Sequence, residues 1–236
     1  MRNVLAIARR EVISYFYSPI AYIVLALFLF ISGFFFFNAL QWERGDLQNL
    51  FYPMGFVFFF FCPLITMRLM SEEMKMGTLE TLMTAPVTDT QVIVGKFLAG
   101  MGFYIFLLLP TLLFPFMVSR IGQVQWGSVM AAYIGLVFLG CFYVSVGLLI
   151  SCLTKNQIIA AVASFIVLLF LWILWWYAND ASDGVLKQLM LYVTVFGHYS
   201  NFIQGLVDTR DAIFYLSATV FLLFLSVRIV EARKWR

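Results

Sequence analysis

Charged side chains are scarce in this sequence of 236 residues. They make up 11% of the chain, whereas hydrophobic residues make up 63% and the mean hydropathy is +0.95. A soluble domain carries about 25% charged and about 45–50% apolar residues. Because no soluble core could bury such an apolar surplus, we expect an all-α polytopic membrane protein.

Residues that usually hold metals are also few. The three cysteines, Cys62, Cys141 and Cys152, lie inside apolar runs without paired metal-ligand spacing, which favours buried apolar packing. His198 is the only histidine and has no acidic neighbour in the sequence, so we expect a polar contact at the outer surface and no metal site. The start of the chain lacks the features of a signal peptide, and we expect no cleavage there.

Long apolar runs are abundant instead. A transmembrane helix needs roughly 20 apolar residues, and six stretches qualify. They are 20–40, 51–69, 97–119, 129–153, 158–177 and 212–230. A seventh stretch, 186–206, is interrupted by polar residues. We therefore expect the region 178–211 to form outer interfacial or re-entrant helices, with a weak span as the alternative.

The six spans divide the basic residues unevenly. Eleven of the fifteen fall on the side that carries both termini, whereas the twelve acidic residues split six and six. An excess of Lys and Arg marks the cytoplasmic side of a membrane protein. Both termini and the segment 71–96 are therefore predicted to be cytoplasmic.

The first 19 residues form a basic amphipathic stretch. Its apolar residues recur at helical spacing: Leu5, Ala8, Val12 and Phe16. Arg2, Arg9 and Arg10 project elsewhere, and Pro19 would end the helix. We expect a helix over 1–19 that lies in the headgroup layer, held by apolar burial and by attraction to anionic lipid.

The spans themselves hold almost no charge. As far as residue 227, Arg68 is the only charged residue inside them, and it lies one turn from a helix end. Carriers and pumps that couple to ions use ionisable groups near the midplane of the membrane. Their absence argues against a proton-driven transporter.

A nucleotide site is missing as well. The one Gly-Lys pair, Gly95 and Lys96, has Thr90 where a phosphate loop needs its first glycine and Phe97 where it needs Ser or Thr. No cluster of carboxylates, histidines or nucleophiles suggests an enzyme of another kind. If the chain performs work, the energy must enter through a partner.

The segment 71–86 is polar and lies between two apolar spans. One helical face would carry its apolar residues and another its polar ones: Met76, Leu79 and Met83, and Glu73, Glu80 and Thr84. We expect a short amphipathic helix that is capped by Ser71, bent at Gly77 and ended by Pro86. Two interpretations remain open: a solvated loop helix, or a ridge that docks a cytosolic protein.

The stretch "SEEMKMGTLETLMTAPVTDTQVIVGK" at 71–96 resembles the signature region of type 2 ABC exporter permeases. The positions that match the pattern are Glu72, Glu73, Gly77, Thr78, Leu79, Glu80, Leu82, Pro86, Gly95 and Lys96. The likeness extends over nearly the whole chain. "SPIAYIV" near the start, "SCLTKNQIIA" at 151–160 and "HYSNFIQGLVDTRDAIFYLS" at 198–217 look most like the gliding-motility-associated permease group.

The resemblance implies a half-transporter in a bacterial inner membrane. Two permeases, identical or related, would form the path between them, and two copies of a separate cytosolic ATPase would bind ATP and Mg, so this chain would hold no cofactor. The residues that would couple it to the ATPase are Glu72, Glu73, Gly77, Thr78, Leu79, Glu80, Leu82 and Pro86. Lys155 and Asn156 would belong to a second, smaller contact at 153–157.

Aromatic clusters end the first and fifth spans on the outer side. They include Phe34 and Phe37 in "FFFF", and Trp172 and Trp176 in "WILWWY". Interfacial belts of aromatic residues explain the second cluster without any function. The alternative is that these rings line the translocation path and face a lipid or glycan substrate.

Two functions therefore remain. The first is the membrane subunit of an ATP-driven exporter, with membrane lipid, a second permease and an ATPase as partners, and with no nucleic acid. The second is a membrane anchor or assembly factor that recruits a cytosolic protein without transport. ATP hydrolysis that responds to the permease would favour the first.

Overall fold

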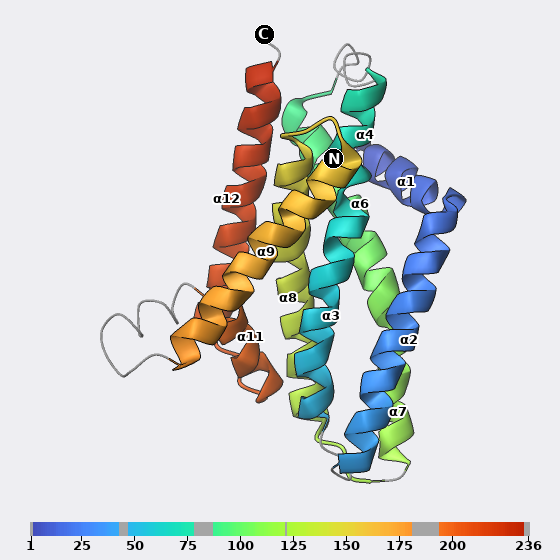
Figure 1. Cartoon of the computed structure of the whole chain (residues 1–236), viewed down its shortest axis with the longest axis vertical. Coiled ribbons are helices and arrows are strands. Elements are labelled where there is room, and N and C mark those ends of the chain that lie inside the picture. Colours follow the sequence, from blue (N-terminus) through green and yellow to red (C-terminus); the bar gives the residue numbers. More distant parts are fainter. Residues whose placement is uncertain (1, 43–46, 78–86, 121, 181–193, 234–236) are drawn as a thin grey trace.

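The computed structural model describes residues 2–42, 47–77, 87–120, 122–180 and 194–233, and these residues form helices without strands. Six helices are long and apolar enough to cross a membrane, as predicted from the sequence. Figure 1 shows the long helices side by side in one bundle. The start of helix α1 (Arg2–Tyr17) and the end of α12 (Thr209–Arg233) lie at the same end of it, which we call the terminal end.

The helices follow the chain up and down the bundle. The first span is α2 (Pro19–Trp42), and the second is α3 (Gln48–Thr66), which continues past Met67 into α4 (Arg68–Met76). The third is α6 (Asp89–Leu108) with a 3₁₀ turn, η1 (Leu109–Leu112), and α7 (Leu113–Ser119). The fourth and fifth are α8 (Trp126–Ser151) and α9 (Gln157–Asp180), and after the short α11 (Val195–Ile203) the sixth is α12.

The third span begins earlier than predicted. Thr88 caps α6: the backbone N–H of Gln91 donates to Thr88 Oγ1, and the backbone N–H of Thr88 donates to Gln91 Oε1. This reciprocal pair satisfies two backbone donors that a helix start would otherwise leave free. The helix therefore starts at Asp89 rather than at residue 97, and Lys96 lies inside it.

The predicted helix over 71–86 is described only in its first part, where residues 71–76 are helical as expected. Helix α4 starts at Arg68, ends at Met76 and has Gly77 after it with a φ of 72°, a left-handed conformation that glycine adopts without a steric penalty. Ser71 is not a cap but a buried residue within α4. The expected continuation over residues 78–86 lies outside the described part of the chain.

The centre of the bundle is formed by α3 and α8. In the most apolar windows of the second, third and fourth spans, 67%, 61% and 72% of residues are buried, against 28%, 17% and 28% in the first, fifth and sixth spans. Glycines let α8 approach its neighbours closely. A Cβ atom at Gly147 would lie 2.0 Å from Thr66 Oγ1, and one at Gly140 would lie 2.3 Å from the ring of Tyr104.

Helix α11 lies within the predicted outer segment. Its nine residues span only about 13 Å, which is less than half of a hydrocarbon core of about 30 Å. It packs against α8, where Phe202 fits over Gly135. The rest of that segment, 181–193, lies outside the described residues.

His198 corrects an expectation from the sequence. It is buried in α11 rather than placed at the outer surface, and its Nδ1 lies 2.6 Å from Asp211 Oδ1. Asn201 Nδ2 donates to the other oxygen of the same carboxylate at 2.9 Å, and the ring of Phe214 stacks on the imidazole. The acidic partner comes from the start of α12, thirteen residues away, so neighbouring positions in the chain held no sign of it.

Gly147 offers a test of this close packing. Replacing Gly147 with Ala places a Cβ atom against Thr66, so we expect the free energy of unfolding to fall by about 1–3 kcal/mol. Gly127→Ala in the same helix is the matched control, because no atom lies within 4 Å of its Cβ position. Thermal unfolding of the purified variants in detergent measures both, and equal midpoints would contradict the packing described here.

Candidate functional site

The helix that carries the first part of the signature segment, α4, lies at the terminal end of the bundle (Figure 1). Side chains from four other helices reach it: α1, α6, α8 and α12. Most of these contacts involve charged groups or backbone atoms. The site is therefore a set of polar links that hold one short helix in place.

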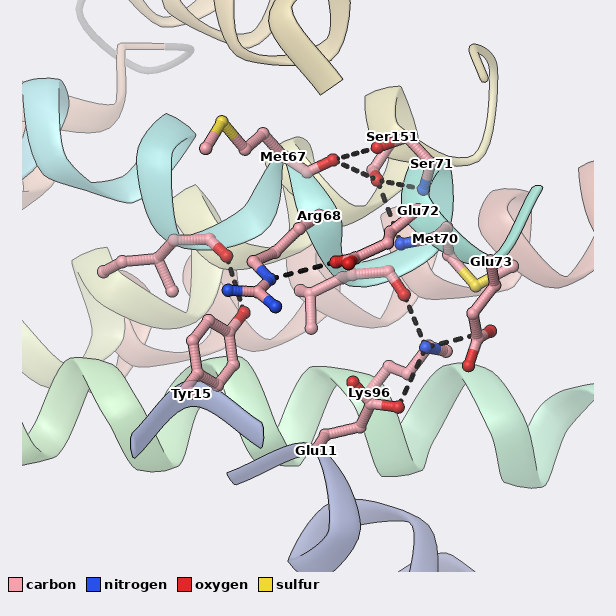
Figure 2. Close-up of polar contacts among 12 residues, drawn as sticks. Glu11, Tyr15, Met67, Arg68, Met70, Ser71, Glu72, Glu73, Lys96 and Ser151 are labelled. Atoms are coloured by element: carbon pink, nitrogen blue, oxygen red, sulfur yellow. Dashed lines mark hydrogen bonds and ion pairs between the residues drawn. The ribbon is translucent and has the colours of Figure 1, made fainter. Parts of the chain in front are cut away.

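Lys96 is the centre of this site. Its side chain is 1% exposed, and its ammonium group lies 3.2 Å from Glu11 Oε1 of α1 and 3.0 Å from Glu73 Oε2 of α4. It also donates a short hydrogen bond to the carbonyl of Leu69. Two hydrogen-bond acceptors and a second carboxylate in ion-pair contact therefore surround the buried charge. Figure 2 shows Lys96 between the two carboxylates.

Arg10 completes an ionic cluster with Glu11, Glu73 and Lys96. Its Nη2 lies 2.8 Å from Glu11 Oε1 and 2.9 Å from Glu73 Oε1, so two cations face two anions. Burial alone would raise the pKa of Glu11, but Lys96 and Arg10 outweigh burial and lower this pKa. The stability that this carboxylate contributes is present above its unfolded pKa of about 4.3 and is lost as the pH falls through the lowered value.

Gly95 lets α1 come close enough to form this cluster. A Cβ atom at this position would lie 2.9 Å from Ile7 Cγ2 and 3.1 Å from the carbonyl oxygen of Val4. Helix α1 packs on α6 through Ile7, Ala8 and Tyr15, which are buried. Of the predicted apolar face, Ala8 is buried in the bundle, Val12 and Phe16 are half-buried, and Leu5 is 64% exposed. In the Gly-Lys pair of the signature, Gly95 therefore permits the close approach of α1, and Lys96 supplies the buried positive charge.

Ser151, the last residue of α8, makes hydrogen bonds to backbone atoms at the junction between α3 and α4. Its Oγ accepts hydrogen bonds from the backbone N–H groups of Met70 and Ser71, at 3.1 and 3.0 Å, and donates to the carbonyl of Met67 at 3.1 Å. These are backbone groups that the turn at Met67 would otherwise leave partly unpaired. Figure 2 shows this bridge on the side of α4 away from Lys96.

Further contacts fix the remaining sides of α4. Arg68 Nε lies 3.1 Å from Glu72 Oε2, and its guanidinium lies over the ring of Tyr15 in α1. At the end of α12, Arg233 donates to Met74 Sδ at 3.1 Å and to the carbonyl of Leu153 at 2.8 Å. Arg233 therefore links α4 to the loop between α8 and α9.

The structure places the predicted coupling residues in different surroundings. Glu72 and Glu73 pair within the chain, and Gly77 ends α4. Lys155 is exposed, and Asn156 Oδ1 accepts from the backbone N–H of Ile158, which caps α9. Five others lie outside the described residues: Thr78, Leu79, Glu80, Leu82 and Pro86.

The aromatic residues predicted for the path are not brought together within one chain. Phe34 and Phe37 lie exposed on α2, and Trp176 lies exposed on α9. Trp172 packs on Phe56 of α3, with ring centroids 5.3 Å apart. Figure 1 shows α2 and α9 on different sides of α3.

Several residues of the site were not recognised in the sequence. They are Glu11, Ser151 and Arg233, and Lys96 was assigned to a polar loop. One sequence signal could have placed Lys96 correctly: Thr88 and Gln91 form a capping box, which predicts a helix start at Asp89, seven residues before Lys96. The others depend on contacts between segments 80 or more residues apart.

Removing the buried charge tests the ionic cluster. Lys96→Met leaves two carboxylates with only Arg10 to neutralise them, so we expect the free energy of unfolding to fall by about 3–5 kcal/mol. Adding Glu11→Gln removes one of these carboxylates and should restore part of the loss. Lys75→Met, at an exposed position of α4, is the control and should change little. Thermal unfolding in detergent measures all three, and equal midpoints for the two lysine variants would contradict the cluster.

Comparison with known proteins agrees with the membrane architecture. Residues 5–231 match the family described as ABC-2 family transporter protein. A search of the curated proteins finds no match. The family match covers nearly the whole chain, and the described residues include six helices long and apolar enough to span a membrane. The chain belongs to the ABC-2 transporter family, as a membrane-spanning permease component of an ABC transporter.

Proposed function

We propose that this chain is the permease subunit of an ATP-driven exporter, coupled to a separate ATPase that binds ATP and Mg. The observation that carries the proposal is the anchoring of α4 by side chains of α1, α6, α8 and α12. A partner that pushes on the signature segment would move α4, and α4 cannot move without pulling on those helices. The signature segment would therefore pass mechanical work to the bundle.

The two proposed ATPase contacts are joined within the chain. The first follows α4, and the second is the loop around Lys155. Arg233 bonds to Met74 of α4 and to Leu153 of this loop, and Ser151 bonds to α4 directly. An ATPase that touches both contacts would thus act on one connected unit.

A second permease copy or a related permease would complete the path. In the fifth span only 17% of the most apolar window is buried, and in the first span 28%, so both keep large apolar faces. Part of these faces would meet the partner permease and part would meet lipid. Phe34 and Phe37 on one copy could then approach Trp176 on the other, although they are apart within one chain.

The proposed orientation in the membrane and the proposed permease group are based on the sequence. The surplus of basic residues favours a cytoplasmic terminal end in a bacterial inner membrane. Three stretches favour the gliding-motility-associated group: "SPIAYIV", "SCLTKNQIIA" and "HYSNFIQGLVDTRDAIFYLS".

Changing the signature segment tests ATPase binding. Leu79→Asp with Glu80→Lys should leave membrane insertion intact and abolish co-purification of the ATPase from the native host, because an apolar contact and a charge are both lost. Arg120→Glu changes an exposed charge beyond the predicted outer end of the third span and is the control. Retained ATPase binding in the double variant would contradict this proposal. A chain that binds a cytosolic protein without affecting ATP hydrolysis would instead be a membrane anchor.

A substitution at Ser151 distinguishes binding of the ATPase from transmission of movement between α4 and the bundle. Ser151→Ala leaves the N–H groups of Met70 and Ser71 without their acceptor, so we expect ATPase binding to persist while transport-dependent stimulation of hydrolysis falls severalfold. Ser145→Ala in the same helix removes only a bond to Phe142 of its own turn and should behave as wild type. ATP hydrolysis by the complex in proteoliposomes measures both, and full stimulation in Ser151→Ala would contradict the role of the bridge.

A further inference from the structure

Helix α1 has one face that the bundle leaves uncovered. Its members are exposed and comprise two arginines and three apolar residues: Arg2, Leu5, Arg9, Ile13 and Tyr17. At 100° per residue they fall within about 120° of one another around the helix. The opposite face packs on α6 and contains the buried residues Ile7, Ala8 and Tyr15.

This face lies at the level where the first span enters the membrane. Helix α1 ends at Tyr17, and the first candidate span begins at Pro19. Figure 1 shows α1 running sideways from the terminal end of α2 instead of along the bundle. An amphipathic helix that runs sideways from the end of a membrane span is suited to the headgroup layer, where apolar side chains reach acyl chains and arginines reach phosphates.

The charge of the face is of one sign. Arg2 and Arg9 make no ion pair with any described residue, whereas the single acidic residue of α1, Glu11, faces inward to Lys96. Tyr17 is 85% exposed and Leu5 is 64% exposed, so the surface presents apolar groups beside its cations. A surface with these two components matches a molecule that has an anionic head and an apolar tail.

The sequence predicts that this stretch is attracted to anionic lipid. We propose that the exposed face of α1 forms a defined binding site for an anionic phospholipid and that Arg10 connects this site to α4. The headgroup phosphate meets Arg2 and Arg9, and the acyl chains meet Leu5, Ile13 and Tyr17. A neutral phospholipid offers the same apolar contact but lacks the net charge, so the arginines give preference for the anionic one.

Arg10 has the geometry for the second role. Its side chain is 56% exposed, and one nitrogen, Nη2, holds both Glu11 and Glu73. Within the described part of the chain, Nη1 and Nε make no hydrogen bond. A guanidinium group has five donors, so Arg10 can bind a phosphate oxygen while it keeps its carboxylates. The lipid then holds Glu73, and hence α4, through one side chain.

Lipid titration of the isolated chain tests the site without any ATPase. The protein in neutral detergent is titrated with fluorescent phosphatidylglycerol and with fluorescent phosphatidylcholine, at low and high salt. We expect wild type to prefer phosphatidylglycerol and Arg2→Gln with Arg9→Gln to lose roughly 25-fold in that affinity, at about fivefold per arginine. High salt should reduce the preference of wild type because exposed charges are screened.

Matched variants distinguish lipid binding at α1 from a general effect of positive charge. Lys75→Gln with Arg228→Gln removes two charges from α4 and α12 and should keep the preference of wild type. A large excess of inorganic phosphate should not displace the lipid, because phosphate lacks the acyl contact. An unchanged preference in the arginine variant, no preference in wild type, or displacement by phosphate would each overturn the proposal.

Size-exclusion elution confirms that each variant is folded. Binding of an acidic peptide to the exposed face of α1, without binding of the lipid, would overturn the proposal and assign the face to a protein partner.

Hydrogen exchange tests the link through Arg10. Phosphatidylglycerol should slow amide exchange within Arg68–Met76 in wild type. Arg10→Gln should retain the lipid preference, with about a fivefold lower affinity, and lose this protection when the lipid is saturating. Equal protection of α4 in wild type and in Arg10→Gln would overturn the connecting role. Because the measurement contains no ATPase, its outcome is independent of the exporter proposal.

Discussion

A buried ammonium group determines the arrangement of the terminal end. Lys96 lies inside a membrane-spanning helix with almost no exposure, and such a charge is tolerated only when carboxylates and carbonyls surround it. Those partners come from two other helices, Glu11 from α1 and Glu73 from α4. The ion pairs that neutralise Lys96 therefore hold α1 and α4 against α6.

The same requirement divides the molecule into two regions. At the terminal end, α1, α4 and the ends of α6, α8 and α12 are joined by ion pairs and by bonds to backbone atoms. Elsewhere the bundle buries fewer than a third of the residues in the most apolar windows of the first, fifth and sixth spans. A firmly joined unit beside loosely covered helices suits a permease in which a push at one end rearranges contacts along the membrane. Hydrophobic contact between spans is weak in lipid, whereas polar links keep their geometry.

Helix α1 has two faces with different contacts in this arrangement. One face packs on α6 around Gly95, and the other carries arginines at the membrane surface. Arg10 lies between the two faces and reaches Glu73. The proposed lipid site and the proposed ATPase contact would thus act on the same short helix from opposite directions, so the membrane composition could influence coupling.

The sequence by itself determined the all-helical fold, the six spans and the family, because apolar runs of about 20 residues and a contiguous signature are local properties. It also contained the capping box of Thr88 and Gln91 that places Lys96 within a helix. Only the tertiary structure decided which charges pair, that α4 begins at Arg68 rather than at Ser71, that His198 meets Asp211 and that Leu5 is exposed while Ile7 is buried. The physical reason is distance along the chain: Glu11 and Lys96 are 85 residues apart, and Ser71 and Ser151 are 80 apart. Such partners are selected by how the helices pack, which no local pattern contains.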